Sequence, residues 1–264
     1  MTPLPATREN TVFLTIAAYK DYEQHTFTLR KTAEKCGIPL LLCDQGERWQ
    51  GFYRHKIEKM QSHLENLFAV GKRFAFILDG RDVAFIDPLD VVLRKFNKLN
   101  RGRAIFNHDV PGKIWPSHNE TLQREIAGKV HSEHPRLNAG MIASDIVTLL
   151  KIQAHATAIR DSLLSGKSQD AFVRKIHHEI GAAHHDDDQH LYQICLACYP
   201  EMFHIDCERE LFAVIMSYPN VMHEHSNDPT RHDVIHHAAI LHSPWLSRGS
   251  DWNEWTLEIA TQRN

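Results

Sequence analysis

Long apolar runs are missing from this sequence of 264 residues. Its most apolar stretches, such as VFLTIAAY (12–19) and FAFIL (74–78), are far shorter than the roughly 20 residues that a membrane-spanning helix needs. We therefore expect no contact with a membrane. An excess of one charge is missing too, because the formal net charge is only −3. No global positive field therefore argues for a nucleic-acid partner.

Cysteine is scarce, with five residues in the chain. An odd number in a long chain favours reduced thiols over a disulfide framework. The N-terminal stretch MTPLPATRENT lacks the charged-then-apolar pattern of a signal peptide, so we expect a cytoplasmic protein. The Cys-x-x-Cys at CLAC (195–198) lies in a helical apolar pattern without a second cysteine pair, which favours core packing over zinc or redox chemistry.

Short apolar runs alternate with helical patterns along the chain. Runs of strand character are found at 12–18, 38–43, 74–78, 103–107, 137–144, 202–206 and 238–242. Helical patterns are found at 20–36, 54–70, from 88 onward, 144–164 and 188–197. This alternation predicts an α/β fold with a mostly parallel central sheet and flanking helices. No linker or repeat divides the chain, so we expect one domain over 1–264 with its core at about 12–248.

Two helix starts and two irregular stretches complete this outline. Asp87 is a suitable N-cap, Pro88 suits the first helical position, and Asp90 favours the positive helix end. Ser144 is the expected cap of the following long helix. We expect 108–136 to be irregular and 217–237 to form a long loop or lid.

The turn Asp79-Gly80-Arg81-Asp82 is the first candidate site. Asp79 ends a buried strand, at the edge where α/β folds bind ligands. Gly80 permits a sharp turn, after which Asp82 can converge with Asp79 on one hard divalent cation. Mg²⁺ or Mn²⁺ takes such oxygen ligands and keeps positions for substrate phosphates. The alternative is a solvated turn without a ligand.

Three adjacent aspartates, at 186–188, precede a predicted helix. One or two of them are explained by the helix dipole, but three repel one another and indicate a metal, a cationic partner or a shared proton. Two weaker candidates follow. The small residues of Leu137-Asn138-Ala139-Gly140 permit close backbone approach to a ligand. His242 ends the last predicted strand, where a lone histidine is more often structural.

In this order the segments resemble one family, the glycosyltransferase domain attached to collagen lysyl hydroxylases. That family has a GT-A fold and uses UDP-sugars with Mn²⁺. The similar segments span about 12–248, and they are HKIEKM (55–60), FILDGRDVAFIDP (76–88), FNHD (106–109), WP (115–116), RLNAGMIAS (136–144), DDDQHLY (186–192), MFHIDCERELF (202–212) and ILH (240–242).

The resemblance implies a role for each matching residue. Asp79, Asp82 and His242 become the metal ligands. Lys56 approaches the sugar nucleotide, with Gly80 and Arg81 beside it. The acidic pair Asp187 and Asp188 lies next to the transferred sugar, where one carboxylate orients the donor or deprotonates the acceptor hydroxyl. The residues that line the donor and acceptor pocket are Asp109, Trp115 and Asn138.

The resemblance therefore implies a metal-dependent transferase that moves a hexose from a UDP-sugar, UDP-glucose or UDP-galactose, to a hydroxyl acceptor. The acceptor is a hydroxylated side chain, a glycan or a hydroxylated nucleobase. Arg54, His55, Lys59, Arg101 and Arg103 line an acceptor groove or are ordinary surface charge. Two departures stand out: Arg81 replaces an aromatic that packs near uracil, and Ser243-Pro244-Trp245 replaces Gly-Asn-Gly. A guanidinium can still stack on a base or bind phosphate.

Twenty histidines, many in pairs, raise two alternatives. A metal-dependent hydrolase is prompted by HHEIGAAHH (177–185), but the zinc protease pattern fails because position 182 is alanine. A histidine-rich metal-binding protein without transferase activity explains the histidine count. It explains neither the α/β pattern nor the paired aspartates.

Overall fold

The computed structural model describes residues 4–108, 120–129, 136–181, 184–214, 237–243, 256–258 and 260–262. Its central sheet has six strands in the order β2-β1-β3-β6-β5-β7. These are β1 (Thr11–Ile16), β2 (Leu40–Cys43), β3 (Phe74–Leu78), β5 (Ala104–His108), β6 (Leu137–Asp145) and β7 (Phe203–Asp206). All pairings are parallel except those of β6 with β3 and β5. The predicted α/β class with a mostly parallel sheet and flanking helices is confirmed.

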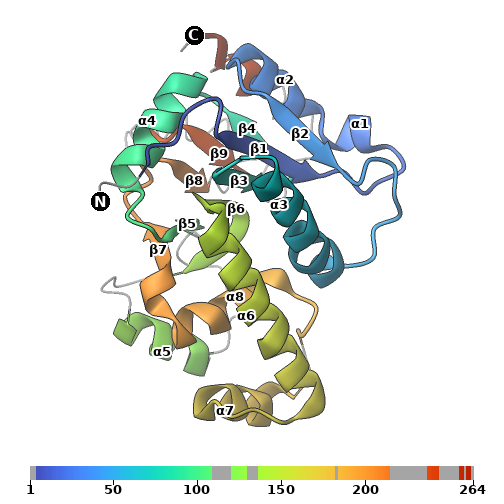
Figure 1. The fold of residues 1–264 in the computed structure, drawn as a ribbon, viewed down its shortest axis with the longest axis vertical. Coiled ribbons are helices and arrows are strands. Elements are labelled where there is room, and N and C mark those ends of the chain that lie inside the picture. Colours follow the sequence, from blue (N-terminus) through green and yellow to red (C-terminus); the bar gives the residue numbers. More distant parts are fainter. Residues whose placement is uncertain are drawn as a thin grey trace, which may run out of the picture.

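Helices cover both faces of this sheet (Figure 1). They are α1 (Tyr22–His25), α2 (Phe27–Lys35), α3 (Met60–Ala69), α4 (Leu89–Leu99), α5 (Glu120–Lys129), α6 (Ile146–Ser165), α7 (Ala171–Ile180) and α8 (Asp188–Cys198), with a π-helix at Tyr53–Lys59 and a 3₁₀ turn at Pro200–Met202. One face packs on the π-helix, α3, α5, α6 and α8. The other packs on α2, α4 and a smaller sheet.

The smaller sheet was not predicted. It joins β4 (Val83–Phe85), β9 (Ile240–His242) and β8 (Phe212–Val214) in the order β4-β9-β8. β9 lies within the predicted run 238–242, but β4 and β8 were missed, because three residues are too few for a period-two pattern. Their pairing matters because it brings the end of the chain's last described strand beside the turn that follows β3.

Two predicted helix starts are wrong by one position. α4 is capped by Pro88 and not by Asp87, whose carboxylate instead accepts from the Lys95 ammonium at 2.6 Å. α6 is capped by Asp145 and not by Ser144, because the Asp145 carboxylate accepts from the Thr148 amide. Asp90 does lie in the first turn of α4, and Gly166 ends α6 in the left-handed conformation.

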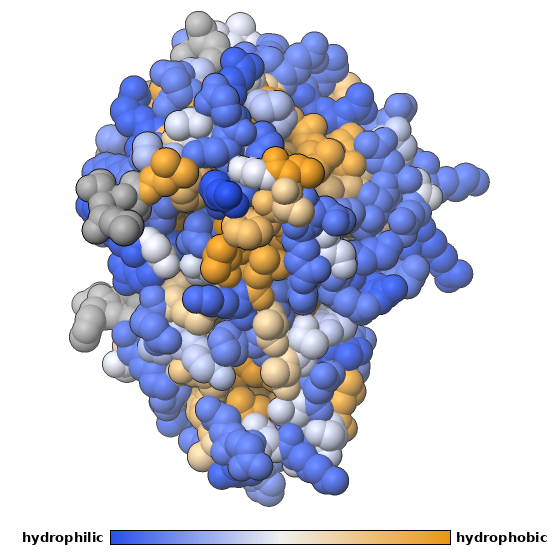
Figure 2. Space-filling model, in the orientation of Figure 1, coloured by the Kyte–Doolittle hydropathy of each residue, from blue (hydrophilic) through white to orange (hydrophobic). Residues whose placement is uncertain are grey.

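The irregular stretch predicted for 108–136 is also wrong in part, because α5 occupies Glu120–Lys129. The loop or lid predicted for 217–237 lies outside the described residues, except for His237. None of the helices that the structure describes combines the length and the apolar character that a bilayer crossing requires. On the face drawn in Figure 2, hydrophilic residues predominate and apolar residues lie in smaller groups among them.

Asp206, at the end of β7, is buried and binds three backbone amides. Its carboxylate accepts from the N–H groups of Glu210, Leu211 and Phe212. This turn directs the chain from β7 into β8, so Asp206 fixes the small sheet to the central one. The Asp206 carboxylate therefore stabilises the turn between the two sheets, a role that the sequence alone did not predict.

We expect Asp206→Ala to lower the free energy of unfolding by about 2–4 kcal/mol, since it leaves several buried amides without an acceptor. Urea denaturation measures the change. Asp161→Ala, at an exposed position on α6, is the matched control and should change stability little. A loss below about 1 kcal/mol for Asp206→Ala would show that the turn holds without its carboxylate.

Candidate active site

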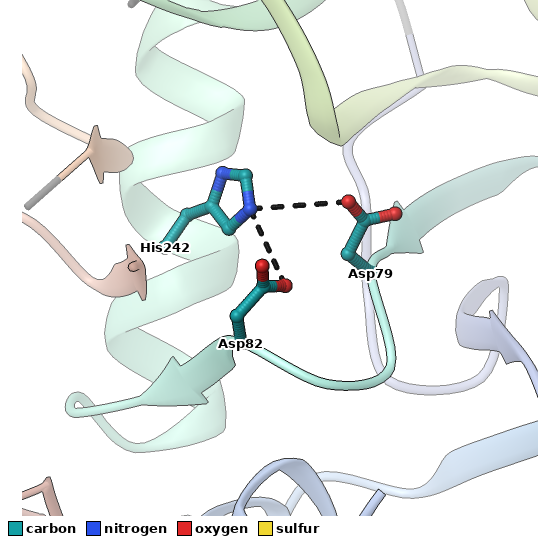
Figure 3. Close-up of side chains that lie close together, drawn as sticks. All are labelled: Asp79, Asp82 and His242. Atoms are coloured by element: carbon teal, nitrogen blue, oxygen red, sulfur yellow. Dashed lines mark ion pairs between the residues drawn. The ribbon is translucent and has the colours of Figure 1, made fainter. Parts of the chain in front are cut away.

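Asp79, Asp82 and His242 converge at the carboxyl edge of the central sheet (Figure 3). Asp79 directly follows β3, Asp82 directly precedes β4, and His242 ends β9, where it pairs with Val83. The His242 Nε2 atom lies 3.3 Å from an Asp82 oxygen and 3.8 Å from an Asp79 oxygen. One ligand atom from each residue lies within 4.8 Å of the others, a separation that one cation can span.

The burial of this group favours a bound cation. His242 is only 2% exposed, and both its Nε2 and Asp82 Oδ1 are buried atoms without a hydrogen bond. Burial alone would raise the pKa of Asp82, but the His242 charge lowers it below its usual value. Burial alone would lower the pKa of His242, but the Asp82 and Asp79 charges raise it. Two carboxylates and one imidazole suit Mn²⁺, and the carboxylates suit Mg²⁺.

Gly140 on β6 lies directly against the His242 ring. A β-carbon at this position would come within 2.2 Å of His242 Cε1 and 2.8 Å of Nε2. The Gly140 carbonyl also accepts from the Asp79 amide at 2.8 Å. This glycine therefore places two of the three candidate ligands. The sequence predicted close approach of a ligand to this segment; the group that approaches is the imidazole.

Lys56 connects the candidate metal ligands to the acidic start of α8. Its ammonium lies 2.6 Å from Asp79 Oδ1 and 3.0 Å from Asp188 Oδ2. Burial lowers the pKa of Lys56, but the charges of Asp188 and Asp79 more than offset this, so the pKa lies above its usual value. The lysine is therefore charged and holds two carboxylates of the site together.

A π-helix, Tyr53–Lys59, carries this lysine, and such turns are frequent at functional sites. The Lys56 carbonyl accepts hydrogen bonds from two side chains. It accepts from the Tyr192 hydroxyl of α8 and the Gln153 amide of α6, both at 3.3 Å. The backbone beneath the ammonium is thus fixed from two helices.

The three adjacent aspartates differ in their partners. Asp186 pairs with Arg160 and His185 at the surface. Asp187 caps α8 by accepting from the His190 amide. Asp188 is buried and pairs with Lys56, so cationic partners explain two of the three, and none joins a metal-ligand group among the described residues.

Burial raises the pKa of Asp187 and of Asp188. The charge of Asp188 raises the pKa of Asp187 further, and Lys56 partly opposes the rise at Asp188. Carboxylates with a raised pKa are better proton acceptors than ordinary surface aspartates. The cap function and this basicity coexist at Asp187.

Asn138 and Gly80 are placed by local contacts. The Asn138 Oδ1 accepts from the Gly140 amide at 2.9 Å, so its buried side chain shapes the segment that supports His242. Gly80 packs on β1 and on the residue between α1 and α2, since a β-carbon there would lie 3.2 Å from atoms of Thr15 and Thr26. Both residues therefore lie beside the candidate metal ligands.

Arg81 is exposed, and its guanidinium lies over the Tyr19 ring, 4.5 Å from the ring centre. One of its nitrogens lies 3.2 Å from His25 Nε2. The Tyr19 ring stacks in turn on Trp49 at 5.6 Å. The Arg81 guanidinium, which stands where the family has an aromatic side chain, thus lies at the end of a stack with Tyr19 and Trp49, next to the candidate metal ligands.

Several other sequence predictions concern surrounding residues. Asp109 and Trp115 lie outside the described residues. Arg54 and Lys59 pair with Glu58 and Glu47, which favours ordinary surface charge over an acceptor groove. Cys195 is buried in α8 and Cys198 packs against the same core, as predicted for CLAC.

Among the described histidines only His242 joins two other potential ligands in one group. His177 and His178 lie in the last turn of α7, and His184 lies 5.7 Å from His190 between ring centres. His223, His225 and His236 lie outside the described residues. Among the described residues, the candidate metal centre is therefore built from two acidic residues and one histidine, without a histidine pair.

The chain matches no protein-family model and no curated protein. Among solved structures, one similar chain is a glycosyltransferase involved in the glycosylation of the major capsid of PBCV-1. The two chains are 11% identical, with a TM-score of 0.45 over 96% of this chain and 98% of the other. At such values the likeness carries no functional argument, and function has to be inferred from the geometry of the residues.

Proposed function

We propose that this protein is a divalent-cation-dependent glycosyltransferase that moves a hexose from a UDP-sugar to a hydroxyl acceptor. The observation that carries the proposal is the convergence of Asp79, Asp82 and His242 beside the Lys56–Asp188 pair. These residues come from distant parts of the chain. Asp79 follows β3 of the central sheet, at the edge where α/β folds bind ligands, and the antiparallel pairing of β4 with β9 brings His242 beside Asp82. Their order along the chain is that of the family which the sequence resembles.

Each residue has a defined part in this reaction. Asp79, Asp82 and His242 would hold Mn²⁺ or Mg²⁺, which when bound neutralises negative charge on the departing diphosphate. Lys56 is a second positive charge at the same place, and it holds Asp79 in the orientation that leaves its other oxygen facing His242. Asp187 or Asp188 orients the donor sugar or accepts the proton of the attacking hydroxyl.

The donor base and the acceptor are separate parts of the proposal. UDP-glucose and UDP-galactose are the proposed donors, with Arg81 at the rim in place of an aromatic side chain. The acceptor presents a hydroxyl on a protein side chain, a glycan or a nucleobase. Gly80, Trp115 and Asn138 are proposed to contact the donor, and Asp109 to act in catalysis.

A donor screen tests this function. Purified protein is incubated with Mn²⁺ and, in turn, UDP-, GDP- and dTDP-sugars, and free nucleotide and sugar are detected by mass spectrometry. The proposal predicts hydrolysis or transfer from a UDP-hexose that stops in EDTA. Equal turnover in EDTA, or no turnover of any donor, would contradict the proposed function.

Asp187→Asn separates capping from chemistry. Asparagine caps a helix about as well as aspartate, so thermal stability should be unchanged within about 0.5 kcal/mol. Turnover should fall by about 10²-fold or more, because the amide is not a proton acceptor. Asp186→Asn, at the surface next to it, is the control and should transfer sugar normally. If Asp187→Asn is fully active, Asp187 has only its structural role.

A further inference from the structure

The first half of β6 has an irregular partner on one side. Phe106 of β5 pairs with Ile142, but the next residue, Asn107, pairs with Asn138. Residues 139–141 therefore have no opposite residue on β5. This bulge includes Gly140, which lies against His242 and binds the Asp79 amide.

Side chains replace the missing ladder bonds. The Gln189 Oε1 of α8 accepts from the Ala139 amide at 3.3 Å, and Asn138 Oδ1 accepts from the Gly140 amide. A buried amide without an acceptor would be costly, so these bonds hold the bulge in one shape. Gln189 directly follows Asp188, whose partner Lys56 contacts Asp79. The bulge and the acidic pair are thus attached to the same helix turn.

We propose that Gln189 is a positioning residue for the metal centre. Through Ala139 it fixes Gly140, and through Gly140 it sets the positions of His242 and Asp79. It touches none of the candidate ligands itself. The inference rests on the proposed function, since it concerns how that site holds a divalent cation, and it assigns to the start of α8 a second role besides supplying carboxylates.

The test measures Mn²⁺ affinity by calorimetry, without any donor or turnover. Gln189→Met keeps the side-chain length but has no oxygen acceptor, and it should weaken Mn²⁺ binding by about 10-fold, as residues that support metal ligands do. Gln189→Glu keeps an oxygen that can accept from Ala139, so its affinity should return to within about 3-fold of the wild type.

Gln193→Met is the matched control. Gln193 lies one turn later on α8 and donates to the Leu137 carbonyl, beyond the bulge, at 3.5 Å. It should lose a similar amount of stability and bind Mn²⁺ normally. Equal weakening by both methionine variants would mean general loosening of α8 and would overturn the inference, as would an unchanged affinity in Gln189→Met. If the wild type binds no divalent cation, both the proposed function and the role of Gln189 are contradicted. If the wild type binds Mn²⁺, the variants test only the role of Gln189.

Discussion

Replacing Asp82 with alanine is expected to abolish sugar transfer, with a fall of about 10³-fold or more in kcat/KM. Asp82 is one of two carboxylates in the candidate centre, and its buried oxygen faces His242 at 3.3 Å. Without it, the remaining ligands are one carboxylate and one imidazole, so cation affinity should fall together with turnover. Steady-state kinetics with a UDP-hexose and Mn²⁺ measure the loss.

Asp90→Ala is the control for this variant. Asp90 belongs to the same aspartate-rich stretch, but it lies exposed in the first turn of α4, where its charge interacts favourably with the helix dipole. Its removal should leave kcat/KM unchanged. Retention of transfer within 10-fold of wild type in Asp82→Ala would contradict the assignment of the turn to a cation.

Adding a single methyl group at Gly140 is expected to be almost as damaging. In Gly140→Ala the new carbon would lie 2.2 Å from His242 Cε1, a distance that no relaxed structure keeps. The imidazole or β6 must move, so Mn²⁺ affinity should fall by about 10–100-fold. Overpacking should also lower the free energy of unfolding by about 1–3 kcal/mol. Calorimetric titration with Mn²⁺ and urea denaturation measure the two effects.

Two further variants separate displacement of His242 from general damage. Gly128→Ala in α5 adds a methyl group that meets nothing within 4 Å, so Mn²⁺ affinity should be normal and stability slightly higher. In the His242→Ala background, Gly140→Ala should weaken Mn²⁺ binding no further, because residues that act together are not additive. An additive loss in the double variant would show that Gly140 acts by another route.

The strand ends were predictable because burial leaves a clear sequence signal. FAFIL is apolar on both faces, and β3 occupies the predicted residues Phe74–Leu78. Since parallel strands end at one edge, the position of Asp79 followed from the sequence. The direction of β6 did not, because a strand that is apolar on both faces has the same pattern in either direction.

The contacts between residues far apart in the chain were harder to predict from the sequence. His242 meets Asp82 through the pairing of β9 with β4, and although the strand of His242 was predicted, the three residues of β4 are too few for a pattern. Gln189 and Gly140 act through backbone hydrogen bonds and close packing, and neither leaves a periodic signal. Gly140 belongs to the small-residue segment for which close approach of a ligand was predicted. Only the fold shows that the His242 imidazole fills the space beside this glycine.

Residue type alone did not separate the roles of the aspartates. Asp87 and Asp90 accompany the start of α4, whereas Asp79 and Asp82 meet His242. Asp186, Asp187 and Asp188 likewise divide into a surface pair, a helix cap and a buried partner of Lys56. Three-dimensional neighbours, not spacing, decide which carboxylate is available for chemistry.

The most direct test of the central claim is a calorimetric titration of the wild-type protein with Mn²⁺, in the presence and absence of UDP. The proposed site predicts one equivalent of Mn²⁺, bound at least about 10-fold more tightly when UDP is present, because the diphosphate supplies further oxygen ligands. Mn²⁺ affinity that does not respond to UDP, or several equivalents of zinc bound without any nucleotide, would contradict it.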